Sequence, residues 1–338
     1  MADLSRRRAA EPAAGHRLHG ELRRPGAAQA PIGGCMSATA AADAYAYTVI
    51  IPAYKAAGTL GTALDSVFAQ QRPPAAVIVI DDGSPDGEAI AAVVAGYGGR
   101  VTLIRQRNQG PAAARNHGVR TAATPWIAFL DADDSWLPEK MARQLALAGE
   151  DRVGLIHGQA RDEREPLPAM LDLDRLWTRN RICTSMVVVR KAAFDAAGGF
   201  DEDPALIGAE DYNLWLRLAA AGWGVRAAQG RIGNYTPAAG SITSQIERCA
   251  AAEIHNARKL GEALGFEPAR IEAKVLAIRT DFGRHLLHAR DLPAARRMLW
   301  APLRRRPRPA VVQLWCATFV PPALLDLRRK LRSRRSAR

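Results

Sequence analysis

The chain between residues 47 and 130 alternates short apolar runs with amphipathic stretches. The apolar runs, rich in β-branched and aromatic residues, lie at 47–51, 77–80, 101–104 and 126–130. The stretches with helical periodicity lie near 59–70, 87–96 and 111–122. Because strand and helix alternate three times, the pattern predicts an α/β fold with a mostly parallel sheet and helices on both faces.

The alternation weakens after residue 150, although a strand at 186–189 and a helix at 210–221 are still predicted. Helical periodicity then covers 245–290 and 294–303. Residues 1–44 show no periodicity, so we expect them to be disordered or, because Met36 is a second possible start, wrongly assigned to the protein. The chain thus divides into an extension, an α/β domain, a helical region and a basic amphipathic tail, at 1–44, 45–240, 241–303 and 304–338.

The positive charge of the chain is confined to its ends. The net charge is +13, but the first 36 residues contribute +3 and residues 296–338 contribute +12, which leaves −2 for the rest. Nucleic-acid binding by the α/β domain is therefore not predicted. The four cysteines are far apart and no apolar leader begins the chain, so a reducing cytoplasm is expected.

The tail carries an apolar run at 309–325 between two arginine clusters. Its 17 residues fall short of the roughly 20 that a spanning helix needs. We therefore expect the tail at 304–338 to lie on an anionic membrane surface, peripherally on the inner face of the cell membrane. The alternative is a helix docked on the catalytic domain with a solvated arginine fringe.

Three carboxylates follow the apolar run at 126–130 directly: Asp131, Asp133 and Asp134. Acids gathered at a strand end repel one another unless a cation lies between them. Mg²⁺ or Mn²⁺ bound by one or two carboxylates and by substrate phosphates is the usual arrangement in phosphate chemistry. The alternative is a solvated acidic turn that caps the next helix.

A second acidic turn follows the run at 77–80, where Asp82 precedes Gly83. Taken alone it is typical of a turn that caps a helix. The strand at 77–80 is expected to neighbour the first strand, however, and that strand ends near Pro52 and Tyr54. A carboxylate and an aromatic ring at this edge could hydrogen-bond and stack on a nucleobase.

Glu210 and Asp211 open the helical run at 210–221. Acids are favoured in a first helical turn by the helix dipole, so a purely structural role is one interpretation. The other is a general base that removes a proton from an acceptor hydroxyl. Successive helical residues point about 100° apart, so only one of the two can face a substrate.

These motifs occur in a fixed order along the chain. They are VIIPAYKAAGTLGTALDSVFAQ, VIVIDDGSPDG, NQGPAAARNHGVRTAATPWIAFLDADDSWLPEK, GGFDED and GAEDYNLWLRLAAAG. Together they resemble the family 2 inverting glycosyltransferases of the GT-A fold over about residues 46–240. The resemblance implies a catalytic domain over 45–240 that binds a nucleotide-sugar.

The resemblance also implies roles for residues at the donor side. Asp131 and Asp133 match the Asp-x-Asp element that binds ribose and a metal diphosphate, and Asp134 is expected to share the Mn²⁺ or Mg²⁺. The nucleoside pocket is implied at Pro52, Tyr54 and Asp82. Because Lys55 stands where the family often has Asn, the contacts on the nucleobase side are open.

Arg115 and Asn116 match a recurrent Ala-Arg-Asn element near the donor, although packing on the helix surface explains them equally well. The Glu210–Asp211 pair matches the base motif of the family. We favour Asp211 as the base and keep Glu210 as the alternative.

The implied function is inverting transfer of one sugar, of the hexosyl type, from a nucleotide diphosphate donor to an acceptor hydroxyl. A UDP-sugar donor and a glycan or lipid-linked acceptor in cell-surface glycan or glycolipid biosynthesis are expected. The sequence lacks the Gln-x-x-Arg-Trp element of the processive synthases, so transfer of a single sugar is favoured. Two alternatives stay open: a nucleotidyltransferase on a related fold, and a catalytically inactive, membrane-associated adaptor.

Overall fold

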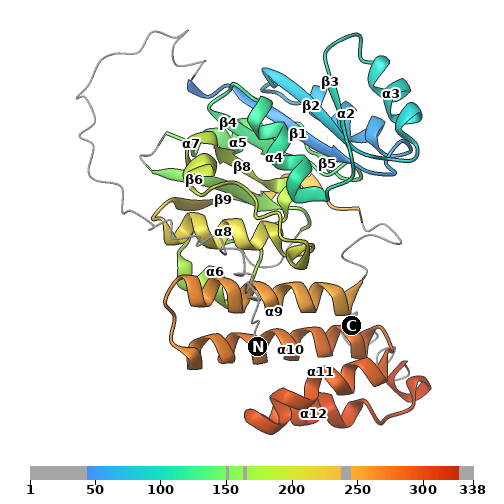
Figure 1. Ribbon diagram of the computed structural model, residues 1–338, viewed down its shortest axis with the longest axis vertical. Coiled ribbons are helices and arrows are strands. Elements are labelled where there is room, and N and C mark those ends of the chain that lie inside the picture. Colours follow the sequence, from blue (N-terminus) through green and yellow to red (C-terminus); the bar gives the residue numbers. More distant parts are fainter. Residues whose placement is uncertain (1–43, 150–151, 163–165, 237–244, 327–338) are drawn as a thin grey trace, which may run out of the picture. The chain divides into compact units, whose positions relative to one another are not determined.

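The computed structural model describes residues 44–149, 152–162, 166–236 and 245–326. Its centre is an eight-stranded sheet in the order β3-β2-β1-β4-β8-β6-β9-β7 (Figure 1). The strands are β1 (Tyr47–Ala53), β2 (Ala76–Asp82), β3 (Thr102–Gln106), β4 (Trp126–Phe129), β6 (Val153–Gln159), β7 (Met170–Leu171), β8 (Val188–Arg190) and β9 (Gly224–Arg231). A separate two-stranded sheet pairs β5 (Ser135–Trp136) with β10 (Gly233–Asn234).

The sheet is mostly parallel, which confirms the predicted fold class. Strands β3, β2, β1 and β4 run parallel, and β6 runs parallel to β9. Strand β8 is antiparallel to both of its neighbours, β4 and β6. Strands β1, β2 and β4 therefore end at one edge of the sheet, which is where α/β proteins bind ligands.

Helices cover both faces because alternate strand residues point to opposite sides. On β1, Val49 and Ile51 join one buried cluster and Ile50 joins the other. The first cluster includes α2 (Leu60–Phe68), α3 (Gly87–Ala95) and α5 (Lys140–Leu145). The second includes α4 (Pro111–Thr121), α6 (Leu173–Thr178), α7 (Lys191–Ala196) and α8 (Glu210–Ala220). Each fully buried aliphatic side chain stabilises the fold by about 1.5–3 kcal/mol.

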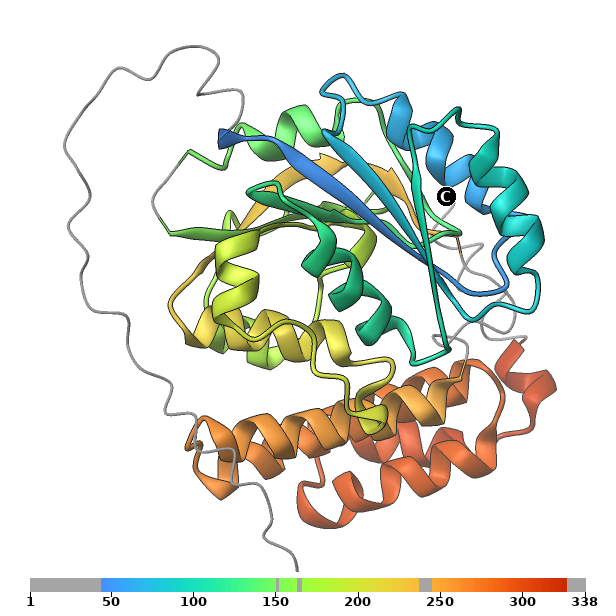
Figure 2. The same ribbon diagram turned by 45° about the horizontal axis from the view of Figure 1, so that its top comes forward.

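Helix α4, the teal helix that lies over the strands in the turned view of Figure 2, approaches the sheet. The approach is close at Gly118. A Cβ atom at Gly118 would lie 2.5 Å from Cγ2 of Ile50. The close approach matters because α4 carries two of the candidate site residues.

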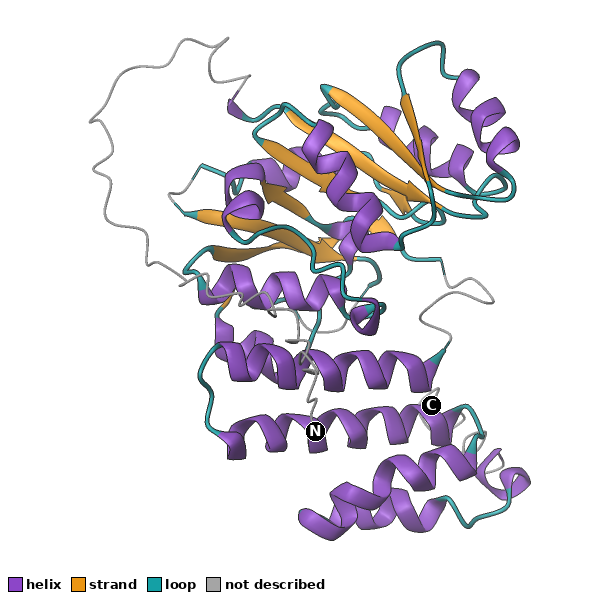
Figure 3. Cartoon of the chain, in the orientation of Figure 1, coloured by secondary structure: helices purple, strands orange, loops and turns teal. Residues whose placement is uncertain are grey.

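The C-terminal region consists of α9 (Ile246–Ala263), α10 (Pro268–His288), α11 (Leu292–Arg305) and α12 (Pro309–Ala317), seen together in Figure 3. The single helical stretch expected over 245–290 is two helices. Gly265 takes a φ of +68° at the break, and Pro268 begins the second helix. Helices α9 and α10 pack on the α8 side of the sheet through Ala257, Leu260, Val275 and Ile278.

The boundaries predicted for the C-terminal tail and the N-terminal extension can be compared with the described residues. The predicted tail begins at 304, but α11 continues to Arg305, and α12 packs on both α10 and α11. The extension at 1–44 lies outside the described residues except for residue 44. Among the helices that the structure describes, none is long and apolar enough to cross a membrane.

Candidate active site

The carboxyl ends of β1 and β2 lie side by side, with Ala53 paired to Asp81. The next residue, Asp82, is buried and accepts three hydrogen bonds: from Nε2 of Gln106 at 2.8 Å and from the backbone N–H groups of Gln109 and Gly110, each at 2.9 Å. A carboxylate offers about four acceptor positions. Asp82 therefore shapes the loop that leads into α4 and keeps about one position for a ligand.

The turn after Asp82 requires glycine. Gly83 has a φ of +67°, and a Cβ atom there would lie 2.6 Å from the backbone N of Asn108. The turn is tied to the end of β1, since the N–H of Lys55 donates to Oγ of Ser84 at 2.6 Å. The two loops that border the predicted nucleoside pocket are thus held together.

Tyr54 directly follows β1 with 49% of its surface exposed, and Nζ of Lys55 lies 5.3 Å from the ring centre. Pro52 is half-buried. Lys55 itself has a φ of +54°. A left-handed backbone costs a non-glycine residue roughly 1–2 kcal/mol, and Asn tolerates it better than Lys. The exposed ring of Tyr54 is available to stack on a planar base.

Arg115 joins two of the predicted acidic motifs. Its Nη2 lies 2.7 Å from Oδ1 of Asp131, and its Nη1 lies 3.0 Å from Oε1 of Glu210. The other oxygen of Glu210 accepts from the N–H of Gly208 at 2.7 Å. Burial lowers the pKa of the guanidinium, but the two carboxylates outweigh burial and raise it. Both oxygens of Glu210 are therefore engaged within the protein.

Asp211 lies in a different environment from its neighbour. Its Oδ2 accepts a hydrogen bond from Oγ1 of Thr184 at 2.7 Å, and its Oδ1 accepts from the N–H of Tyr212 at 2.5 Å. Burial, and then the charge of Glu210, raise the pKa of Asp211 to about 7, although Thr184 and Arg115 act in the opposite direction. A carboxyl group with a pKa near neutrality is well matched to proton abstraction at that pH.

Thr184 belongs to a short 3-10 turn, η1 (Thr184–Met186), that also holds the Asp131–Asp134 turn. Oγ of Ser185 donates to Oδ2 of Asp134 at 2.5 Å and accepts from the N–H of Asp131 at 3.1 Å. Sequence reasoning missed both hydroxyl residues. The available signal was a Thr-Ser pair directly before the apolar strand at 186–189.

Asp134 is a buried anchor of this turn. Besides Ser185, the N–H of Thr236 donates to its Oδ1 at 2.8 Å. Burial raises the pKa of Asp134 to about 7, which the Ser185 hydrogen bond partly offsets. Both of its oxygens thus accept hydrogen bonds from the protein.

Asp131 and Asp133 are better placed to hold a cation. The Asp131 side chain is 34% exposed, and Asp133 is half-buried. Burial and then the charge of Asp131 raise the pKa of Asp133, a repulsion that a divalent cation relieves. Within the described ranges no three acidic, histidine or cysteine side chains form a metal-binding group. The residues present fit a cation held by one or two carboxylates together with substrate phosphates.

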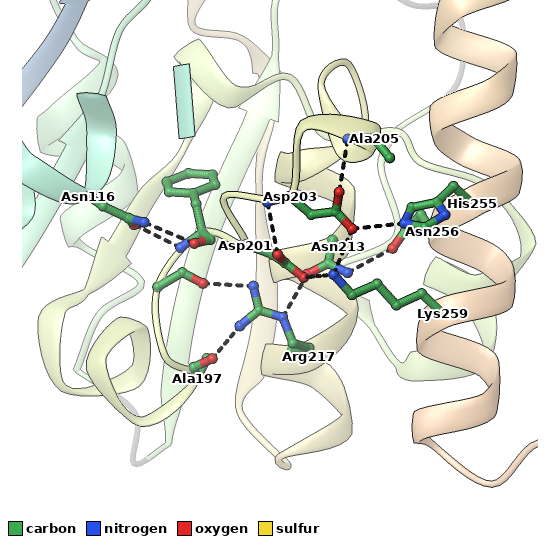
Figure 4. A network of polar contacts seen from close by, with 12 residues as sticks. Asn116, Ala197, Asp201, Asp203, Ala205, Asn213, Arg217, His255, Asn256 and Lys259 are labelled. Carbon is green, nitrogen blue, oxygen red and sulfur yellow. Dashed lines mark hydrogen bonds and ion pairs between the residues drawn. The ribbon is translucent and has the colours of Figure 1, made fainter. Parts of the chain in front are cut away.

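Asn116 ties α4 to the segment before α8 (Figure 4). Its Oδ1 accepts from the N–H of Phe200 at 2.8 Å, and its Nδ2 donates to the carbonyl of Phe200 at 2.9 Å and to Oε1 of Glu202 at 2.7 Å. The amide of Asn116 is therefore used to position the 198–203 loop.

A cavity of about 230 Å³ lies between the 198–203 loop and the start of α4, with Glu210 in its wall. His255 and Lys259 of α9 point toward Asp201 and Asp203 of this loop, as Figure 4 shows. Nζ of Lys259 lies 2.7 Å from Asp201 and 3.0 Å from Asp203, and Nε2 of His255 lies 2.9 Å from Asp203. The N–H of Ala205, and then His255 and Lys259, lower the pKa of Asp203.

Comparison with known proteins places this arrangement in a family. Residues 48–186 match the sequence profile described as "Glycosyl transferase family 2". The chain is 35% identical over 198 residues to a succinoglycan biosynthesis protein of Rhizobium meliloti, covering 52% of this chain and 57% of the relative. It is 30% identical over 174 residues to a PGL/p-HBAD biosynthesis glycosyltransferase of Mycobacterium bovis, covering 50% of this chain and 68% of the relative.

The fold is similar to that of a mannosyltransferase from Pyrobaculum calidifontis, with a TM-score of 0.58 and 20% identity over 85% of this chain and 82% of that one. The chain spans less than two thirds of the length of the first two curated relatives that it matches, 57% and 61%. On the sequence identity and the shared motifs, the chain belongs to glycosyl transferase family 2.

Proposed function

We propose that this glycosyltransferase inverts the anomeric centre and uses Asp211 as its general base. The observation that carries the proposal is the contrast between the two acids that open α8. Each acid accepts two hydrogen bonds, but Glu210 is paired with the charged Arg115, whereas the donors to Asp211 are the neutral Oγ1 of Thr184 and N–H of Tyr212. Burial and the charge of Glu210 raise the pKa of Asp211 to about 7. Of the two, Asp211 is the acid whose proton affinity suits the reaction.

In the proposed reaction the acceptor oxygen attacks the anomeric carbon, and the bond from that carbon to the diphosphate oxygen breaks. The acceptor proton passes to Asp211, and the nucleoside diphosphate leaves with the bonding electron pair. Asp131 and Asp133 would hold Mn²⁺ or Mg²⁺, which when bound neutralises charge on the diphosphate. Arg115 positions Asp131 relative to α8 through its two ion pairs.

The donor pocket is proposed at Pro52, Tyr54 and Asp82, with a UDP-sugar as the donor. Support for a nucleotide-sugar and a divalent cation comes from the mannosyltransferase of similar fold, which was solved with GDP-Man and Mn²⁺. The acceptor is proposed to be the hydroxyl of a cell-surface glycan or glycolipid. The relatives that act in succinoglycan and PGL/p-HBAD biosynthesis support this choice.

The first test is a thermal-shift series of the full chain with UDP, GDP, dTDP and CMP, each with and without Mn²⁺. A ligand at 100 times its Kd adds about 2.7 kcal/mol to the free energy of unfolding. Stabilisation by one nucleotide that requires Mn²⁺ is the expected result. A folded sample that responds to none of them would contradict the proposed donor site. NMR of the product sugar then distinguishes inversion from retention.

A further inference from the structure

Helix α12 presents one apolar face to the protein and a second one to solvent. Val311, Leu314 and Thr318 pack inward at helical spacing. On the other side lie Val312, 38% exposed, and Phe319, just past the helix end and 56% exposed. An exposed large apolar surface of this kind marks a site of interaction.

Helix α11 adds a matching stripe of Arg296, Trp300 and Arg304, four residues apart. Trp300 is 50% exposed, and its ring centre lies 6.1 Å from that of Trp315 on α12. The guanidinium of Arg304 lies 5.7 Å from the Trp300 ring, and that of Arg296 lies 4.9 Å from the Phe319 ring. We call this surface the aromatic–arginine face, formed by Arg296, Trp300, Arg304, Val312, Trp315 and Phe319.

The charge around this face is strongly positive. Residues 292–326 contain six arginines and one acidic residue, Asp326. Arg297 and Arg305 pair with glutamates of α9 and α10. Arg304, Arg306 and Arg308 are exposed and form no ion pair with any residue in the described ranges. The occupant of the face must therefore be anionic as well as apolar.

We propose that the aromatic–arginine face docks α11 and α12 onto a bilayer that contains anionic phospholipids. Tryptophan rings prefer the interface between headgroups and acyl chains. Arginines beside them attract the lipid phosphates, and each contributes about a fivefold gain in binding. The functional consequence of this docking rests on the proposed function: it would hold the catalytic domain beside an acceptor at the membrane.

The other occupants fit the face less well. The chain's longer remaining segments are not acidic: 1–43 has six arginines against four acids, 237–244 is uncharged, and every charged residue of 327–338 is basic. Segments 150–151 and 163–165 are acidic, but they are only two and three residues long. A second copy placed by two-fold symmetry would bring like charges together. Single-stranded RNA needs open ring faces for stacking, whereas Trp315 and Phe319 meet edge to face at 4.7 Å.

Because α11 and α12 are packed on α10, the face is tested by point substitutions in the full chain. Binding is measured by co-sedimentation with vesicles of equal parts phosphatidylcholine and phosphatidylglycerol, and with vesicles of phosphatidylcholine alone. Arg304→Gln with Arg306→Gln, which removes one arginine of the face and one exposed arginine near it in the chain, should weaken binding to the mixed vesicles by about 30-fold. Phe319→Ser should weaken binding to them as well, since it removes an inserted ring.

The matched control is Arg120→Gln with Arg258→Gln, which removes two exposed arginines elsewhere and should leave binding unchanged. Equal loss in the control pair, or equal binding to both kinds of vesicle, would overturn the proposal. Vesicle binding at the wild-type level by both the arginine variant and Phe319→Ser would also overturn the proposal. Dimers by light scattering, or capture of oligouridine that the face variants lose, would assign the face to another occupant. Nucleotide-induced thermal shifts of the same variants report separately on the proposed function.

Discussion

Replacing Thr184 with valine tests how the proposed base is tuned. Valine keeps the shape of the side chain but removes the hydroxyl that donates to Oδ2 of Asp211 at 2.7 Å. This hydrogen bond favours the ionised carboxylate and lowers its pKa, against the larger effects of burial and of Glu210. Without the hydroxyl, the pKa of Asp211 should rise further above about 7.

The magnitude follows from the strength of a hydrogen bond to a charged group. Such a bond is worth about 1.5–3 kcal/mol, which corresponds to about one to two pKa units. Below the pKa, each unit by which the pKa rises lowers the ionised fraction of Asp211 tenfold. Turnover on the acidic limb of the pH profile should therefore fall by about ten- to a hundredfold.

The assay measures kcat and kcat/KM across a pH series with one nucleotide-sugar and acceptor. The acidic limb of the profile should move to higher pH for Thr184→Val, while KM for the donor stays near the wild-type value. Thr184→Ser keeps a hydroxyl and should restore the profile. An unmoved limb, or equal impairment by serine, would refute the reasoning. A separate variant, Asp211→Asn, should lose about 10²–10⁴-fold in kcat. Full activity of that variant would exclude Asp211 as the general base.

Three further predictions concern the carboxylates and a buried histidine. Asp133→Asn should abolish the Mn²⁺-dependent part of nucleotide stabilisation in a thermal-shift assay, and an unchanged dependence would exclude Asp133 as a ligand. Arg115→Met leaves buried Glu210 without its cation, so denaturant unfolding should show a loss of about 3–5 kcal/mol, against little loss for the exposed control Arg120→Met. His157 is fully buried, and neither ring nitrogen has a hydrogen-bond partner among the described residues. Burial lowers its pKa from 6.5 to about 4, so the unfolded chain binds the proton more tightly and stability should fall by about 3 kcal/mol as the pH drops from 6.5 to 4. His157→Leu should flatten this loss, and an unchanged pH dependence of unfolding would contradict it.

The sequence by itself determined the order of strands and helices up to β4 and the acidic turns at their ends. A strand that is buried on both faces appears in the sequence as a short continuous apolar run, such as 77–80. Such a run can be recognised from the local sequence alone. The turn at Gly83 is equally local, because its left-handed backbone requires glycine. Strands β6 and β9 were missed, since antiparallel β8 lies between β4 and β6 and breaks the regular alternation.

Only the tertiary structure shows how the surroundings of the two acids differ. Glu210 and Asp211 are adjacent and chemically similar, and sequence reasoning left open which one is the base. Arg115 lies 95 residues from Glu210, and Thr184 lies 27 residues from Asp211. A proton affinity depends on burial and on the charges within a few ångströms. Those neighbours come together only when the sheet and α8 pack, so no local pattern in the sequence could assign them.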